Sequence, residues 1–536
     1  MKIFWLNRHC LWQVVLVTAI AAMLGLYLPF NTNVKHFTGI TKFYKFHNDV
    51  KFATTISPTT LPPKYSLARY ELALSRIAIN RNIYLAIADF AYADYATNLY
   101  LTSFKRLSIE NYLFVALDEK CCEVLDARGI NCLQHFQNFS IGLTRSQVTT
   151  PSFNLKTNTR ARIVLDALKL GYNPFLVDLD IVFVLDPGPI VYELGAKHEL
   201  VIQDDGGGRF NTGFYYARPS RNIIDFFEVA YNISQSPKAK KGELENDQKV
   251  MRKIIADKNQ KRKVDMHLLD GKKFVTGLDY WETNQISFND VHPWKKKDKG
   301  YPDTVILHNN YIATEEAKVY RFKEALLWTV DKNGYYSDSD RKYLTYTNPI
   351  LKTEQGLDQE RDALVNALSI GYLLNRTVIL PAFHCFETRG YFCRSNDQEC
   401  SLLPLYHVET FDKYFDNAYR EHVFLSHDLV PESTRRSQTK PLYFGSEFQD
   451  QMQLSLAENT SKIVYVAANK TKGATSAEIQ EWFADVKEKV LVFHNLYGVF
   501  AGFEMTSATE DIRARLKKAL VRCNYRQRWC KHTRWF

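Results

Sequence analysis

Apolar and polar positions along the first half of the chain predict short strands that alternate with helices. Two apolar runs, Asn82–Asp89 and Asn111–Asp118, are rich in strand-forming residues, and each ends in a carboxylate. Between them, four residues recur at the spacing of one helical face: Tyr92, Tyr95, Ala96 and Leu99. This alternation predicts a mostly parallel sheet with helices on both faces, which binds ligands outside the carboxyl ends of its strands.

A further helix leads directly into an apolar run that carries two acids. Arg160–Leu170 has an apolar stripe and reaches Gly171, a residue typical of helix C-termini. The run Pro174–Leu185 comes next, and we predict a single strand that carries Asp178 and Asp180. Because side chains alternate along a strand, these two carboxylates are expected to project to the same side.

The pair of acids is the strongest chemical signal in the chain. Two like charges so close are costly unless a cation or hydrogen-bond donors neutralise them. The residues around Asp178 and Asp180 are apolar, which places the pair at the end of a buried strand. A hard divalent cation, Mn²⁺ or Mg²⁺, suits such a site and also takes phosphate oxygens as ligands. We therefore predict a metal site; the alternative is two solvated carboxylates that cap backbone amides.

The second half of the chain repeats the α/β pattern after a polar stretch at Tyr335–Arg341. We predict a domain boundary there, with one domain over residues 71–333 and a second α/β domain over residues 345–536. Four elements are expected in the second domain: helix Glu360–Leu374, strand Thr377–Leu380, strand Lys462–Ala467 and helix Ser476–Val490.

The N-terminus predicts a membrane anchor. Leu11–Phe30 contains no charged residue and reaches the roughly 20 residues that a bilayer core requires. Lys2 and Arg8 precede it, so the short tail is expected to stay cytosolic and the body to be lumenal, in a single-pass type II protein of the Golgi membrane. The alternative is a cleaved signal peptide that ends near Ala19–Ala22. We predict a cytosolic tail over 1–10, an anchor over 11–30 and a stem over 31–70.

Composition narrows the class of protein further. The 536 residues are 46% hydrophobic and 24% charged, which argues against disorder, and a single apolar stretch excludes a polytopic membrane protein. The net charge is +10, but basic and acidic residues are interleaved, so no nucleic-acid partner is expected.

Cysteine and sequon usage fits a lumenal body. Eight of the nine cysteines follow the predicted anchor, an even number that suits disulfide pairing. The alternative is a zinc site built from His384, Cys385, Cys393, Cys400 and His407. Glycosylation sequons add weaker support at Asn138, Asn232, Asn375, Asn459 and Asn469.

Several ordered motifs resemble one enzyme family. The run GYNPFLVDLDIVFVLDP, from Gly171 to Pro187, resembles the signature strand of nucleotide-diphospho-sugar transferases, as in glycosyltransferase family 77 with its plant xylosyl- and arabinosyltransferases. Three further segments resemble the family in the expected order: Asn211–Ser220, Asn246–Gln248, and His308–Tyr311 with Lys318 and Arg321–Lys323. The resemblance covers roughly residues 80 to 330.

This resemblance implies a GT-A fold, a Rossmann-like mixed sheet with helices on both faces. It also implies a glycosyltransferase that moves a hexosyl or pentosyl group from a nucleotide sugar, in particular a UDP-sugar, to a hydroxyl of a glycan or glycoprotein, with retention and with a divalent metal, usually Mn²⁺. Asp178, Asp180 and His308 would be the metal ligands. Contact with the ribose is the alternative role for Asp178, and a hydrogen-bonded strand-end histidine is the alternative for His308.

The resemblance also suggests roles for the residues around the metal. Arg160 or Arg162 would hold the diphosphate, with one of the two on a solvated helix face. Asn211 and Gly213 would bind the donor, although Gly213 also suits a bulge in an ordinary strand. Asp247 and Asp205 would be the catalytic or sugar-holding acids. Asp204 precedes Asp205 and is close enough in sequence to join the site. The triglycine Gly206–Gly208 follows Asp205, and we interpret it as a turn.

Two other functions remain open at this point. Gly356–Pro381 also resembles the opening helix of O-fucosyltransferase-like domains, which would make the C-terminal half a GDP-sugar transferase, although no His-x-Arg element follows it in a suitable place. A catalytically inactive lumenal glycan-binding or scaffold protein is the other alternative. A protease or esterase is not supported, because G-x-S-x-G and H-E-x-x-H motifs are absent.

Overall fold

The computed structural model describes most of the chain after residue 65: residues 66–134, 151–236, 238, 243, 245–257, 264–283, 303–348, 354–384, 399–403, 405–445, 463–468, 472–503, 506–519, 521–523 and 530–532. The residues from Lys64 onward form one compact unit. The predicted tail and anchor, and the stem up to residue 65, lie outside the described ranges. Within these ranges, no helix combines the length and the apolar character that crossing a bilayer requires.

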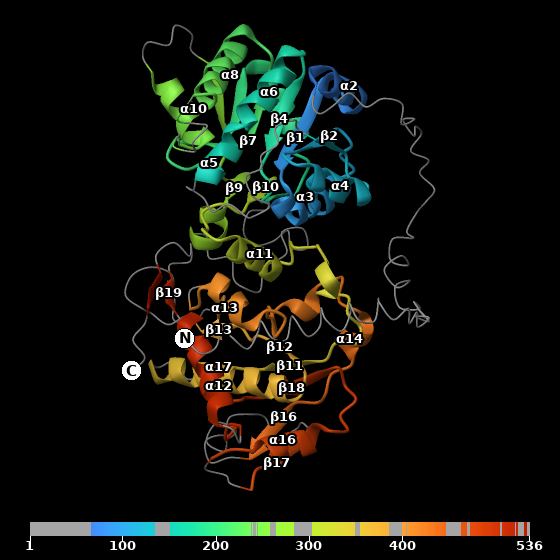
Figure 1. Ribbon diagram of the computed structural model, residues 1–536, viewed down its shortest axis with the longest axis vertical. Helices are drawn as coiled ribbons and strands as arrows, with labels where there is room; N and C mark the ends of the chain where they lie inside the picture. Colours follow the sequence, from blue (N-terminus) through green and yellow to red (C-terminus); the bar gives the residue numbers. More distant parts are fainter. Residues whose placement is uncertain are drawn as a thin grey trace, which may run out of the picture. The chain divides into compact units, whose positions relative to one another are not determined.

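A seven-stranded mixed sheet forms the centre of the first half (Figure 1). Its spatial order is β3 (Cys132–Gln134), β2 (Tyr112–Ala116), β1 (Asn82–Ala88), β4 (Asn173–Val177), β7 (Phe210–Ala217), β6 (Leu200–Asp204) and β8 (Met266–Leu269). β7 runs antiparallel to β4 and to β6, whereas the other neighbours are parallel. The mostly parallel arrangement predicted from the alternation is therefore broken by β7.

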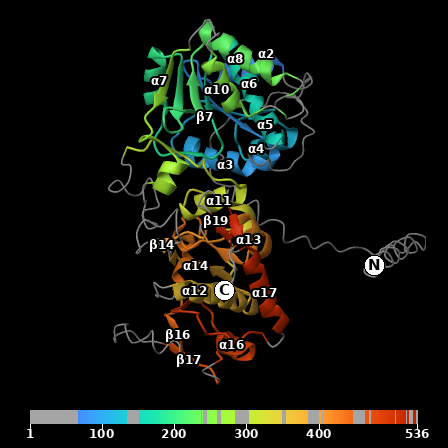
Figure 2. The same cartoon turned by 90° about the vertical axis from the view of Figure 1, so that its left-hand side faces the viewer.

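Helices cover both faces of this sheet, as expected. Ile83 and Leu85 of β1 pack in one apolar cluster, which includes residues of α2 (Leu67–Ile77), α6 (Arg160–Lys169), α8 (Arg221–Ser234) and α10 (Asp247–Ala256). Tyr84 and Ala86 alternate with them and pack in another cluster, with residues of α3 (Ala93–Leu99), α4 (Glu119–Ala127) and α7 (Gly188–Lys197). Figure 2 shows α7 on one side of the strands and α6 and α10 on the other.

The predicted single strand Pro174–Leu185 is wrong. β4 ends at Val177, and Ile181–Phe183 forms a separate strand, β5, in a three-stranded sheet with β10 (Ile306–His308) and β9 (Phe274–Thr276). The chain turns between the two strands, because β4 pairs with β1 and β7 whereas β5 pairs with β10. Asp178 and Asp180 therefore lie in the connection between two sheets rather than along one strand.

A six-stranded, all-parallel sheet organises the second half. Its order is β15 (Tyr419–Arg420), β12 (Thr377–Ile379), β11 (Tyr343–Tyr346), β18 (Val490–Phe493), β16 (Leu442–Gly445) and β17 (Ile463–Val466). The helices around it are α12 (Glu354–Leu373), α13 (Val408–Phe415), α14 (Glu432–Arg436), α16 (Ser476–Phe483) and α17 (Thr506–Ala519). The predicted helix Ser476–Val490 is too long: it ends at Phe483, and Val490 begins the central strand β18. The domain boundary stays a prediction.

Helix α11 (Glu315–Glu324) connects the cores of the two halves. Ala317 and Tyr320 pack in the apolar cluster that contains Phe411 of α13, and Phe322 packs in the cluster that contains Val182 and Val490. Apolar contacts with the three-stranded sheet and with the six-stranded sheet therefore hold α11 in place.

The described cysteines confirm one disulfide. Cys122 and Cys132 join α4 to β3, whereas Cys121 is buried without a disulfide partner in the described part of the chain. Cys523 and Cys530 are register partners across β19 (Val521–Cys523) and β20 (Cys530–His532). Cys385 and Cys393, on which the zinc alternative depends, lie outside the described residues. Asn232, the asparagine of one sequon, lies near the end of α8.

Candidate active site

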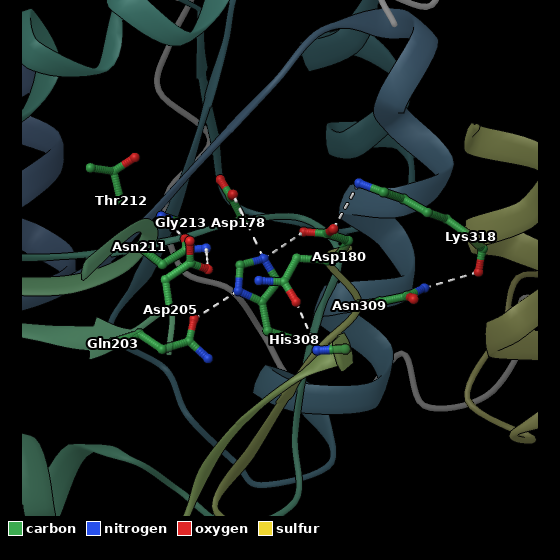
Figure 3. A network of polar contacts seen from close by, with 12 residues as sticks. Asp178, Asp180, Gln203, Asp205, Asn211, Thr212, Gly213, His308, Asn309 and Lys318 are labelled. Carbon is green, nitrogen blue, oxygen red and sulfur yellow. Dashed lines mark hydrogen bonds and ion pairs between the residues drawn. The ribbon is translucent and has the colours of Figure 1, made fainter. Parts of the chain in front are cut away.

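Asp178, Asp180 and His308 converge at the carboxyl end of β4 (Figure 3). The backbone N–H of Asp178 donates to the carbonyl of Gly213 at 2.6 Å, which fixes the end of β4 against β7. The turn that follows brings the Asp180 carboxylate back beside Asp178. One ligand atom from each of the three side chains lies within 4.8 Å of the others, and Asp180 and His308 are buried.

His308 is oriented by a neighbour on β6. Gln203 donates its amide N–H to the carbonyl of Phe274 at 3.1 Å, so its Oε1 faces His308 Nδ1 at 2.8 Å. In the neutral ring Nδ1 therefore carries the proton, and the Nε2 lone pair faces the acids. Nε2 lies 3.3 Å from Asp180 Oδ1 and 3.9 Å from Asp178 Oδ2. In metal-bound histidines, one ring nitrogen typically donates a hydrogen bond that orients the ring, and the other nitrogen binds the metal. His308 has this arrangement.

Two cations balance the acids from either side. Arg160 Nη2 lies 2.6 Å from Asp178 Oδ1 and its Nη1 lies 3.4 Å from Asp247 Oδ2. Lys318 of α11 donates to Asp180 Oδ2 at 2.8 Å. Burial acts to raise the pKa of Asp180, but the charge of Lys318, together with His308 when its ring is protonated, holds that pKa well below its ordinary value. Asp180 is therefore ionised and able to act as a ligand at neutral pH.

A second group of polar side chains surrounds Asp205. Asn211 Nδ2 donates to its Oδ1 at 3.0 Å, and Arg252 Nη2 lies 3.1 Å from its Oδ2. Gln248 donates to the same oxygen at 3.4 Å and accepts from the backbone N–H of Thr212 at 3.1 Å. These contacts tie the start of α10 to β7 and hold Asp205 in one orientation.

Asp247 is the buried acid of this group. It is the first residue of α10, and Asn246 caps that helix by accepting from the backbone N–H of Lys249. Burial raises the pKa of Asp247 to about 6; the nearby Arg160 acts in the opposite direction and Asp178 adds to the rise. A carboxylate with this pKa changes its protonation state close to neutral pH.

Gly213 is required by close approach rather than by a bulge. A Cβ at this position would lie 2.3 Å from Asp178 Oδ2 and 2.8 Å from His308 Cε1. The register shift in the β6–β7 pair lies instead at Ile202 and Gln203. The absence of a side chain at Gly213 therefore makes room for the two ligands.

The structure decides between the two arginines of α6. Arg162 pairs with Asp166 at 2.6 Å and donates to Tyr231 Oη at 2.9 Å, on the face away from the acids. Arg160 is the one that reaches the acids. The triglycine is a turn in which all three residues have positive φ, and Asp204 accepts from the backbone N–H of Gly206.

All eight predicted site residues line one cavity of about 310 Å³: Arg160, Asp178, Asp180, Asp205, Asn211, Gly213, Asp247 and His308. Sequence reasoning assigned no role to several other lining residues: Asp89, Tyr92, Lys156, Glu315 and Lys318. Asp89 ends an apolar strand in the same way as Asp178, a signal that was available in the sequence. Lys318 and Glu315 come from α11, and nothing in the local pattern places α11 beside β4.

The three converging ligands fit a divalent cation. Two carboxylates and an imidazole nitrogen are a donor set that Mn²⁺ and Mg²⁺ accept, with Mn²⁺ favoured by the nitrogen. The space between them is kept open by Gly213, where a side chain would collide with two of the three ligands.

Comparison with known proteins places part of the chain in a family. Residues 107–322 match the model of the nucleotide-diphospho-sugar transferases. A UDP-galactose:fucoside alpha-3-galactosyltransferase of Dictyostelium discoideum is 23% identical over 273 residues, which cover 43% of this chain and 40% of the relative. A UDP-D-xylose:L-fucose alpha-1,3-D-xylosyltransferase of Arabidopsis thaliana is 29% identical over 205 residues, which cover 34% of this chain and 51% of the relative.

The chain thus spans about half the length of these curated relatives, or less. Among solved structures, the glycosyltransferase GlyE of Streptococcus pneumoniae is 12% identical and covers 81% of this chain and 98% of its own, with a TM-score of 0.31. Because this TM-score is low, the fold is described from its own strand order and not from this similarity.

Proposed function

Because residues 107–322 form a nucleotide-diphospho-sugar transferase domain, we propose that the chain is a metal-dependent glycosyltransferase. It would transfer a hexosyl or pentosyl group from a UDP-sugar to a hydroxyl of a glycan or glycoprotein, with retention of the anomeric configuration. The single observation that carries this proposal is the convergence of Asp178, Asp180 and His308 in a cavity that also contains Arg160 and Lys318. Because the family match covers most of the seven-stranded sheet, we also propose that this sheet has the GT-A fold.

The charges of the cavity suit a nucleotide sugar. Asp178, Asp180 and His308 would hold Mn²⁺ or Mg²⁺, which supplies Lewis-acid stabilisation of the diphosphate leaving group. Arg160 and Lys318 are cations that line the same cavity, and each pairs with one of the two acids. They would bind phosphate oxygens and favour the charge that develops there as the glycosidic bond breaks.

Another group of side chains that line the cavity suits the transferred sugar. Asp205, Asn211, Asp247 and Gln248 present carboxylate and amide groups, which accept hydrogen bonds from and donate them to hydroxyls. The contacts of Asn211, Gln248 and Arg252 pre-orient Asp205, so that binding a sugar requires little rearrangement. The names of the relatives support UDP-galactose or UDP-xylose as the donors to test first.

We also propose that the chain is a single-pass type II protein of the Golgi membrane, with the cavity in the lumen. The support is the uncharged stretch Leu11–Phe30 behind Lys2 and Arg8. A tagged chain treated with glycosidase and protease in sealed membranes tests the orientation, and protection of the C-terminal half is the expected result.

A donor screen tests the activity. The purified full chain in detergent is incubated with UDP- and GDP-sugars, with and without Mn²⁺, and release of the nucleotide is measured. We expect hydrolysis of one or a few UDP-sugars that requires the metal and is lost in Asp178→Asn. A chain that binds no nucleotide in the presence of metal would favour the scaffold alternative. Release of GDP that is unaffected by Asp178→Asn would favour a transferase in the C-terminal half.

A further inference from the structure

Glu315 is a buried acid in the cavity wall that the proposed function leaves without a role. It is the first residue of α11 and is only 8% exposed. Its Oε1 accepts a hydrogen bond from Tyr92 Oη at 3.2 Å, and its backbone carbonyl accepts one from Tyr95 Oη at 2.9 Å. Its Oε2 is buried and has no hydrogen-bond partner among the residues that the structure describes.

Helix capping does not explain this burial. Acids in the first turn of a helix are favoured by the helix dipole, but that interaction does not require the carboxylate to be buried. Glu316, the next residue, supplies a first-turn charge from a half-exposed position, and Thr314 accepts from the backbone N–H of Ala317 as the cap. A buried carboxylate oxygen without a partner costs roughly 1–3 kcal/mol or more, so it points to a missing donor.

Glu315 lies between Tyr92 and Lys318, which both line the cavity. On one side is Tyr92, in the segment that follows β1 and is capped by Asp89. On the other side is Lys318, one helical turn along α11, which contacts Asp180. Consistent with this position, the charge of Glu315 is among those that raise the pKa of Lys318 against the opposing effect of burial.

Several side chains that line the cavity suit a flat, partly apolar group. Leu117, Phe153 and Tyr92 are among them, and Lys156, which also lines the cavity, lies 2.5 Å from Asp89 and 5.9 Å from the centre of the Tyr92 ring. These side chains suit a nucleobase, whereas Lys318 suits a diphosphate. The ribose is the part of a nucleotide that joins the base to the diphosphate. An ionised carboxylate can accept a hydrogen bond from a ribose hydroxyl but cannot donate one.

We propose that Glu315 selects the donor by accepting a hydrogen bond from a ribose hydroxyl of the nucleotide. This inference rests on the proposed function and adds a specificity-determining residue to it. A phosphate is excluded as the partner of Glu315, since two anions would repel each other. Sugar hydroxyls would be bound instead by Asp205 and Asp247, which line the same cavity.

Nucleotide binding to the full chain with Mn²⁺ tests the proposal by calorimetry. The ligands are UDP and its 2′-deoxy and 3′-deoxy analogues, and the proteins are wild type, Glu315→Ala, Glu315→Gln and the matched control Glu316→Gln. The wild type and the control should bind at least one deoxy analogue roughly tenfold more weakly than UDP. Glu315→Ala should bind UDP about as weakly as that analogue, with the preference lost, and Glu315→Gln should retain part of it.

The possible results are distinguishable. Equal preference for UDP over the deoxy analogues in Glu315→Ala and wild type would overturn the role of Glu315. So would equal binding of all three ligands to the wild type. A wild-type chain that binds none of them, nor GDP, would overturn the proposed function itself. Thermal unfolding of each variant shows whether a loss of binding reflects a loss of folding, and Glu315→Gln, which keeps the side-chain shape, serves if Glu315→Ala does not fold.

Discussion

His308 Nε2 lies 3.3 Å from Asp180 Oδ1, and this distance is set by backbone pairing between two strands. β10 runs antiparallel to β5, with His308 opposite Ile181, and the backbone N–H of Asn309 donates to the carbonyl of Asp180 at 2.8 Å. The two side chains therefore meet because their strands pair, even before any metal binds. A site pre-formed in this way loses little entropy on binding its ion.

Asp180→Asn should lower metal-dependent nucleotide-sugar turnover about 100-fold or more, because it removes a charged ligand and the partner of Lys318. Metal affinity from calorimetry and turnover from nucleotide release are the measurements. Asp340→Asn, which changes an exposed acid, is the control and should behave as wild type. Circular dichroism should show an unchanged fold, and wild-type turnover in Asp180→Asn would remove the proposed metal role.

Gly213→Ala should weaken metal binding by about tenfold or more, because the added Cβ would lie within 3 Å of both Asp178 and His308. Gly271→Ala is the matched control: no atom lies within 4 Å of a Cβ there, and Gly271 does not have a positive φ. Titration with Mn²⁺ measures both variants. Equal affinities would mean that β7 can move away from the ligands at no cost.

The activity should depend on the ionisation of Asp247, whose pKa is raised to about 6. If its carboxylate accepts hydrogen bonds from the sugar, kcat/KM should fall roughly tenfold per pH unit below about 6 and be level above it. Asp247→Asn should have lower activity and no such fall between pH 5 and 7. A wild-type limb that persists in Asp247→Asn would assign the ionisation to another group.

Stability should depend on Glu324, at the contact between α11 and the second half of the chain. Ser401 Oγ donates to its Oε2 at 2.6 Å, and burial raises its pKa to about 8. A raised folded-state pKa stabilises the fold at low pH. That contribution is fully present below the unfolded value near 4.5 and is lost as pH rises through about 8.

Between pH 5 and 8, the free energy of unfolding of wild type relative to Glu324→Gln should therefore fall by an amount on the order of a few kcal/mol. Chemical denaturation at several pH values measures this difference. Glu316→Gln, at a half-exposed acid on the same helix, should parallel the wild type. Parallel curves for Glu324→Gln and wild type would mean that Glu324 is already ionised throughout this range.

Local sequence patterns determined some elements of the first half and the two acids. β1, β2 and α6 lie within a residue or two of the predicted bounds, because apolar periodicity follows directly from helix and strand geometry. The pair Asp178 and Asp180 was identified for a local reason too, since two charges within an apolar run require neutralisation.

Tertiary structure decided what no local pattern contains. The run from Pro174 to Leu185 is apolar throughout, and only the different pairing partners of β4 and β5 divide it at the two acids. Arg160 and Arg162 are equivalent in the sequence, and the packing of α6 turns one to Asp178 and the other to Asp166. Lys318 and Glu315 enter the cavity only because α11 packs beside it. Electrostatic and hydrogen-bond partners are set by distance in space, which the chain specifies through long-range packing rather than through neighbouring residues.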